Sequence, residues 1–275
     1  ILMKRLIFCF LILFFFSGCE KKINWPLKGE PGKLVVVDGI ITGQPAKTQV
    51  LTLTFPVSEL NAKPAPVTGA TLQISDEDSV FHMTESPAGS GVYHSNEQFY
   101  AREGKNYSLL IFYKDQVISA KSAIASAKTF DFLLTSKDEN SGLYHISWVA
   151  SSFSTGSPAM WEVKLNWSGV SGYEHADSNS TRARLCFYTL STLDVSEIFA
   201  PSLEKFSFPY GTIITETRYS LTPDYAEFIR EVLLETQWQG GLFNSVPANV
   251  TTNLSKGGAG FFAVCGVNSL TQVLQ

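Results

Sequence analysis

The sequence predicts a mainly β protein, in which an antiparallel sandwich is followed by a second mostly-β domain with one amphipathic helix. Two observations favour this class. Short segments alternate apolar and polar residues with the period of two that a half-buried strand requires, and glycine- and proline-rich turns separate them. Only one segment of the chain repeats its apolar residues at helical spacing.

The first folded domain is expected over residues 33–125. Its segments with strand character are 34–37, 49–55, 69–75, 91–93, 106–112 and 116–120. Roughly seven strands at this short spacing are typical of an immunoglobulin-like antiparallel sandwich. The acidic run Asp76-Glu77-Asp78 offers carboxylates to a calcium ion, but the tip of a hairpin explains it as well and is the favoured interpretation.

The second domain is expected over residues 126–275. Alternating strands are predicted at 143–149 and 161–167, and further candidates at 182–188 and 211–218. In residues 161–167 every other residue is apolar and large. Trp161 and Trp167 are therefore expected in the core.

A helix is predicted over about 222–236. Thr222 is a favourable N-cap, Pro223 suits the first helical position, and Asp224 adds a negative charge to the first turn. The apolar residues that follow at helical spacing are Tyr225, Phe228, Ile229, Val232 and Leu233. They form one stripe that is expected to lie across a sheet, and Gly240-Gly241 is expected to end the helix.

The N-terminus resembles a lipoprotein signal peptide over residues 1–18. Lys4-Arg5 is followed by 11 apolar residues, Leu6 to Phe16, a run too short to cross a bilayer. Ser17 and Gly18 then precede Cys19, as in the lipobox at which a bacterial cysteine receives acyl chains. We therefore expect lipidation of Cys19, a tether over residues 19–32, and attachment to the cell outer membrane, with the periplasmic or surface face undetermined.

Two further cysteines belong to the expected folded part. Cys186 and Cys265 could form a disulfide in an oxidising compartment, or they could be two separately buried side chains. Their separation along the chain does not decide between these alternatives.

Catalytic and metal-binding patterns are not found in the sequence. The histidines lack metal-ligand spacing, and their positions are His82, His94, His145 and His175. The glycine-rich run 257–260 lacks the further residues of a nucleotide-binding loop and is expected to let the chain reverse tightly. A formal net charge of −4 without basic runs argues against nucleic acid. We expect a non-enzymatic protein without cofactor or metal.

Three stretches resemble a Bacteroidetes lipoprotein family, the domain of unknown function 4249. The first joins Cys19 to residues 33–42. The second comprises residues 67–76, 91–93 and 104–109, and the third comprises Tyr225, Phe228 and residues 247–250, 252–254 and 257–262. The resemblance implies an outer-membrane lipoprotein, often encoded beside TonB-dependent receptors, and it assigns no functional residue other than Cys19.

The leading functional hypothesis is a binding or accessory lipoprotein that works with an outer-membrane TonB-dependent receptor. The alternative is a carbohydrate-binding or adhesion module, whose sugar-stacking residues would be Trp148, Trp161, Trp167 and Trp238. A hydrolase whose catalytic residues meet only in the fold is a third hypothesis.

Overall fold

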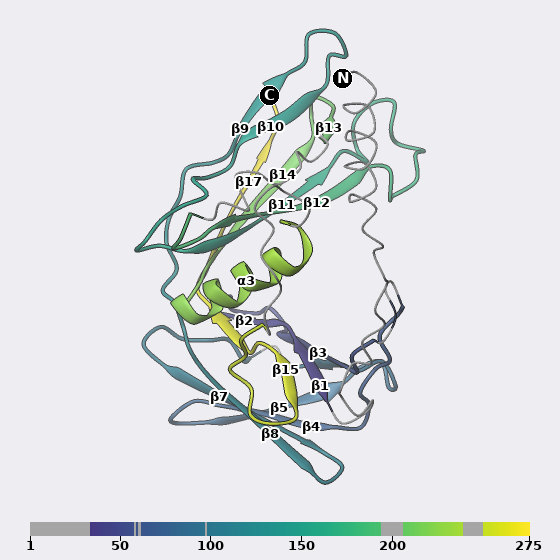
Figure 1. Cartoon of the computed structure of the whole chain (residues 1–275). Coiled ribbons are helices and arrows are strands. Elements are labelled where there is room, and N and C mark those ends of the chain that lie inside the picture. The colour runs from purple at the N-terminus through teal and green to yellow at the C-terminus, as the bar shows by residue number, and fades with distance from the viewer. Residues whose placement is uncertain (1–33, 58, 60–61, 97, 194–205, 239–249) are drawn as a thin grey trace, which may run out of the picture. The chain divides into compact units, whose positions relative to one another are not determined.

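The computed structural model describes residues 34–57, 59, 62–96, 98–193, 206–238 and 250–275 (Figure 1). The structure is mainly β with a single helix among these residues, which confirms the predicted fold class. The signal peptide 1–18, Cys19, the tether 19–32 and Gly240-Gly241 lie outside the described residues. In the described ranges, none of the helical structure has the length and apolar character of a membrane span.

The N-terminal half forms an eight-stranded sheet in the order β15-β1-β3-β6-β5-β4-β7-β8. The bounds are β1 Val35–Asp38, β3 Val50–Thr54, β4 Thr71–Ser75, β5 Val80–Glu85, β6 Val92–His94, β7 Asn106–Tyr113, β8 Gln116–Ala123 and β15 Gly258–Gly260. Six of them match the predicted segments closely. The sequence did not predict β5, because Met83 is its only fully buried side chain and the alternation is weak. The immunoglobulin-like character of this sheet stays a prediction.

Alternation along these strands places one face of each strand in a shared core. Leu51, Leu72, Ile74, Leu109 and Ile111 have no solvent exposure and belong to one apolar cluster. Each such side chain stabilises the fold by about 1.5–3 kcal/mol when it is removed from water. The core therefore accounts for the period of two that the sequence shows.

A C-terminal segment joins the two edges of this sheet. β15 pairs in parallel with β1, and Leu254 forms a bridge with Ala120 of β8. Ser255 N donates to Ser119 O at 2.8 Å, and Ser119 N donates to Ser255 Oγ at 2.9 Å. We name residues 250–260 the closing segment, because they hydrogen-bond to both β8 and β1 and so contact both sides of the sheet.

Strand pairing crosses the predicted boundary after residue 125. Besides β15, strand β16 (Ala263–Cys265) pairs in parallel with β2 (Ile40–Thr42) of the N-terminal half. The described chain from Leu34 onward belongs to one compact unit. Residues 258–265 therefore pack with the first predicted domain although they come late in the sequence.

The second half contains two further sheets, ordered β12-β11-β14-β17 and β13-β10-β9. The bounds are β9 Leu134–Lys137, β10 Tyr144–Trp148, β11 Ala159–Asn166, β12 Arg182–Thr189, β13 Ser207–Phe208, β14 Ile213–Ser220 and β17 Val267–Val273. Trp161, Val163, Leu165 and Trp167 are all buried in one cluster, as predicted from their shared strand face. Strands β9, β13 and β17 were not predicted.

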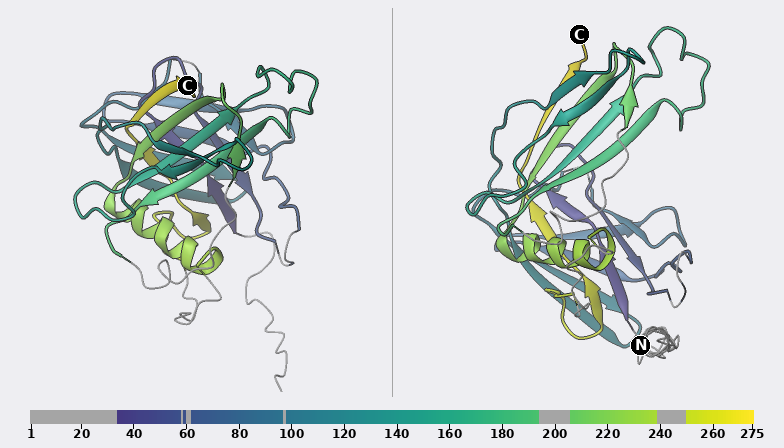
Figure 2. Two further views of the ribbon diagram at one scale, coloured as in Figure 1. Left: turned by 90° about the horizontal axis from the view of Figure 1, so that it is seen from above. Right: turned by 45° about the horizontal axis from the view of Figure 1, so that its top comes forward.

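Helix α3 (Pro223–Thr236) begins and ends close to its predicted bounds. Ile229 and Leu233 are buried in a cluster that also contains Tyr219 of β14 and Phe261 beside β16. Figure 2 shows the helix lying beside the sheets rather than within one. The apolar stripe therefore connects the four-stranded sheet with Phe261 and strand β16 near the C-terminus.

Replacing Thr222 with alanine is expected to lower the free energy of unfolding by about 1 kcal/mol. Thr222 Oγ1 accepts a hydrogen bond from Tyr225 N at 3.3 Å and so satisfies an N–H group at the start of α3. Thermal unfolding should shift by roughly 2–4 °C in a domain of this size. Thr236→Ala is the matched control at the other end of the helix, and an equal shift there would contradict the capping role.

Candidate functional site

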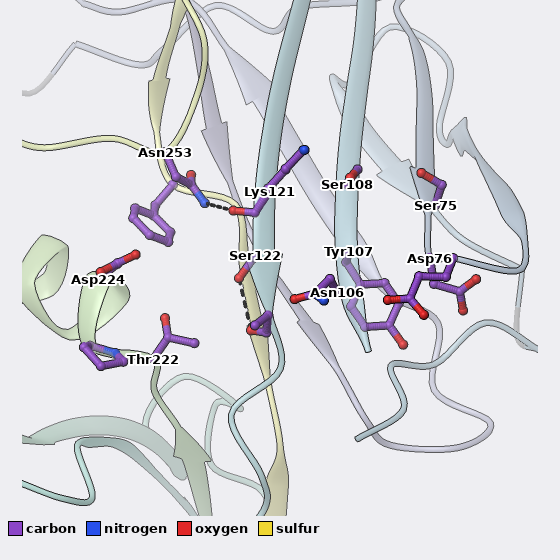
Figure 3. A pocket seen from close by; sticks show the side chains of 14 residues that line it. Ser75, Asp76, Asn106, Tyr107, Ser108, Lys121, Ser122, Thr222, Asp224 and Asn253 are labelled. Atoms are coloured by element: carbon purple, nitrogen blue, oxygen red, sulfur yellow. Dashed lines mark hydrogen bonds between the residues drawn. The ribbon is translucent and has the colours of Figure 1, made fainter. Parts of the chain in front are cut away.

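A groove of about 590 Å³ lies beside the start of α3 (Figure 3). One wall contains Asp76 and Glu77 from the β4–β5 turn, and the floor contains residues 106–108 of β7 and 121–123 of β8. Residues 222–224 at the start of α3 form part of the opposite wall. Residues far apart in the sequence therefore meet at this surface.

The acidic wall is a hydrogen-bonded hairpin turn. Asp76 Oδ1 accepts hydrogen bonds from Asp78 N at 2.9 Å and Ser79 N at 2.7 Å. Lys105 Nζ lies 2.6 Å from Asp78 Oδ2 and 3.5 Å from Glu77 Oε2. The hydrogen bond from Lys105 and its charge hold the pKa of Asp78 below the ordinary value. The run Asp76-Glu77-Asp78 thus has the geometry of the hairpin tip that the sequence favoured.

Asn253 fixes the closing segment beside the groove. Its Nδ2 donates to Lys121 O at 2.9 Å and to Phe262 O at 2.8 Å, and its Oδ1 accepts from Phe262 N at 3.0 Å. Asn253 therefore positions the wall of the groove, because its amide group is occupied by main-chain partners.

The exposed side chains in the lining are polar, and more of them are acidic than basic. Asn106 and Lys121 are exposed on the floor, and Glu77 and Asp224 are exposed on the two walls. Lys121 is the single basic residue among the described residues that line the groove. This arrangement offers hydrogen bonds and favours a neutral polar or positively charged group over an anion.

A second groove of about 590 Å³ adjoins the first along β7 and β8. It shares Ser108, Lys121 and Asn253 with the first groove and continues toward Leu110 and Ser119. The two grooves together follow the outward side of these strands beside the closing segment. This continuous surface is the candidate site for a partner or an extended ligand.

The residues that the sequence singled out do not meet at this site. Cys19 lies outside the described residues. Cys186 is an exposed free thiol on β12, and Cys265 is a buried free thiol on β16, so the possible disulfide between them is not formed. Burial raises the pKa of the Cys265 thiol to about 12, which keeps it protonated. Within the described ranges, no three His, Cys, Asp or Glu side chains cluster in a way that suits a metal ion.

The four tryptophans considered for sugar stacking do not form a platform. Trp161, Trp167 and Trp238 belong to two different buried clusters, whereas Trp148 is 46% exposed on β10. Trp161 Nε1 donates to Thr189 Oγ1 at 2.9 Å, so its polar atom also has a partner inside the protein.

A known protein family matches a range that includes the whole candidate site. The family model described as "Domain of unknown function (DUF4249)" matches residues 20–271. This range contains both grooves, the closing segment and α3. No curated protein shows significant similarity to the sequence.

Proposed function

The chain belongs to the DUF4249 family, and from this premise we propose that it is a non-enzymatic, lipid-anchored binding protein of the outer membrane. In this proposal it serves as an accessory partner of a TonB-dependent transport system. The observation that carries the proposal is Ser17-Gly18-Cys19 directly after an apolar run of 11 residues. Each buried acyl CH₂ contributes about 0.8 kcal/mol, so two or three chains on Cys19 hold the protein firmly at the membrane.

The groove supports binding more than catalysis. Its carboxylates already have structural roles: Asp76 closes the hairpin turn, Glu77 faces Lys105, and Asp224 lies in the first turn of α3. Exposed polar side chains such as Asn106 and Lys121 remain available for hydrogen bonds to a partner. A protein loop with polar or basic side chains fits this lining better than an anionic partner does.

A photo-crosslinking amino acid at Asn106 tests the proposal. Asn106 is exposed and lines the groove. In cells that make the lipidated protein, we expect this position to form an adduct with an outer-membrane barrel receptor, identified by mass spectrometry. Asn140 at the β9–β10 turn is a matched control, because it is exposed but remote from the lining of the groove.

A secreted variant with a conventional signal peptide and Cys19→Ser supplies the second arm. Without acyl chains we expect the protein to leave the membrane fraction and the receptor adduct to disappear. A Cys19 thiol that carries no lipid in the native protein would contradict the anchor. Equal adducts from positions 106 and 140 would contradict the assignment of the groove.

A further inference from the structure

Strand β17 has one unpaired edge. It pairs with β14 through seven residue pairs, from Val267 opposite Tyr219 to Val273 opposite Ile213. Among the described residues, no strand pairs with its other side. The five residues from Ser269 to Val273 are exposed, and the exposed fraction is 36% for Leu270 and 53% for Val273.

The register shows which main-chain groups point away from β14. Ser220 N donates to Gly266 O and Leu274 N donates to Thr212 O, each at 2.9 Å. Because hydrogen-bonded pairs alternate in an antiparallel ladder, the even-numbered residues of β17 direct their N–H and C=O groups toward β14. The odd-numbered residues, including Ser269 and Thr271, therefore present theirs at the unpaired edge.

This edge lacks the features that usually protect a strand from pairing with another chain. β17 contains no charged residue and no proline, and its register has no bulge. At the opposite edge of the same sheet, β12 carries exposed Arg182 and Arg184. The contrast within one sheet indicates that β17 is open to strand addition and β12 is not.

The residue pattern of β17 is symmetric about Leu270. Asn268 and Gln272 are both amides, Ser269 and Thr271 are both hydroxyl residues, and Val267 and Val273 are identical. An antiparallel copy centred on Leu270 would pair all seven residues with a chemical match at each position. Ser269 would then form a hydrogen-bonded pair with Thr271 of the second copy, in agreement with the direction of their main-chain groups.

We propose that β17 is an interface for a second copy of this chain, in which two β17 strands pair antiparallel about a two-fold axis through Leu270. The two four-stranded sheets then form one continuous sheet across the axis. No charges oppose each other, and the exposed Leu270 and Val273 side chains gain apolar neighbours from the second copy.

Cysteine cross-linking tests this register in membranes that contain the lipidated protein. Leu270→Cys, made with Cys186→Ser to remove the exposed thiol, places two sulfur atoms at a directly opposed pair. The Cα atoms of such a pair are about 4.5 Å apart, within the range of a disulfide. After mild oxidation we expect roughly tenfold more disulfide-linked dimer than for Gln272→Cys, whose copies lie about four residues apart along the paired strands.

Leu270→Lys provides the complementary variant, because it opposes two like charges at the axis. We expect it to weaken dimerisation of the purified lipidated protein at least about tenfold in sedimentation experiments. A monomeric native protein at about 100 µM, far above the dissociation constants of ordinary specific complexes, would overturn the proposal. So would a Leu270→Cys disulfide to a different protein, or equal yields from positions 270 and 272.

Discussion

Replacing Gly260 with alanine is expected to lower the free energy of unfolding by about 4 kcal/mol, among the largest effects of a single substitution. Gly260 has a φ of +87°, and a Cβ atom there would lie 2.2 Å from Val37 O and 3.2 Å from Val37 C. Both of these atoms belong to the backbone of β1, which pairs with β15 through Val37 and Gly260. Only separation of the closing segment from β1 relieves this contact.

Gly89→Ala is the matched control for this substitution. Gly89 has a φ of +82°, and a Cβ atom there has no neighbour within 4 Å. Gly89→Ala therefore costs about 1–2 kcal/mol for an alanine in a left-handed conformation, but it creates no close contact with another backbone atom. Thermal unfolding followed by circular dichroism should show a shift for Gly260→Ala several degrees larger than for Gly89→Ala. Equal shifts would contradict the role of the closing segment.

The closing segment also shows where prediction from sequence stops. Strands such as β3 and β7 were predicted because one face is buried and the other is partly exposed, so each residue carries information. β15 consists of Gly258, Ala259 and Gly260, which have almost no side chains to alternate. Its partner β1 begins more than 200 residues earlier, and local patterns do not encode a parallel pairing over that distance.

Strand β17 was not predicted from the sequence, for a different physical reason. Most of its side chains are exposed on both faces, so no apolar alternation marks the strand. The first groove could not be predicted either, because it combines the β4–β5 turn, β7, β8 and the start of α3. Thr222 and Asp76 were noticed for their local roles as helix cap and hairpin residue, and those local roles are the part that sequence patterns can specify.

Two buried glutamates on neighbouring strands have opposite electrostatic surroundings. Burial alone would raise the pKa of Glu162, but hydrogen bonds and charge from Lys164 and Arg184 outweigh it and lower the pKa. Glu216 of β14 has no exposure and accepts one hydrogen bond, from Leu133 N to Oε2 at 2.8 Å. Its Oε1 has no hydrogen-bond partner in the described part of the chain, and burial raises its pKa to about 7.

Glu216→Gln is therefore expected to stabilise the protein above neutral pH. Because the folded-state pKa lies above the ordinary value of 4.5, the folded protein holds this proton more tightly than the unfolded chain. The associated stability is complete below about pH 4.5 and is lost as pH rises toward 7. A tenfold change in proton affinity corresponds to about 1.4 kcal/mol, so the loss reaches about 3 kcal/mol above pH 7. Glutamine keeps an acceptor for Leu133 N and does not ionise.

Urea unfolding at pH 5 and pH 8, followed by the fluorescence of buried Trp161 and Trp167, measures this difference. The stability of Glu216→Gln relative to the native protein should increase by about 2.5 kcal/mol between the two conditions, because a small part of the loss has already occurred at pH 5. Glu162→Gln is the contrasting variant. The ion pairs of Glu162 stabilise the fold only when its carboxylate is charged, so the loss of stability caused by Glu162→Gln should become smaller as pH falls. Parallel pH dependence of the native protein and Glu216→Gln would show that Glu216 is ionised in the fold, with a counter-charge or water satisfying the Oε1 atom.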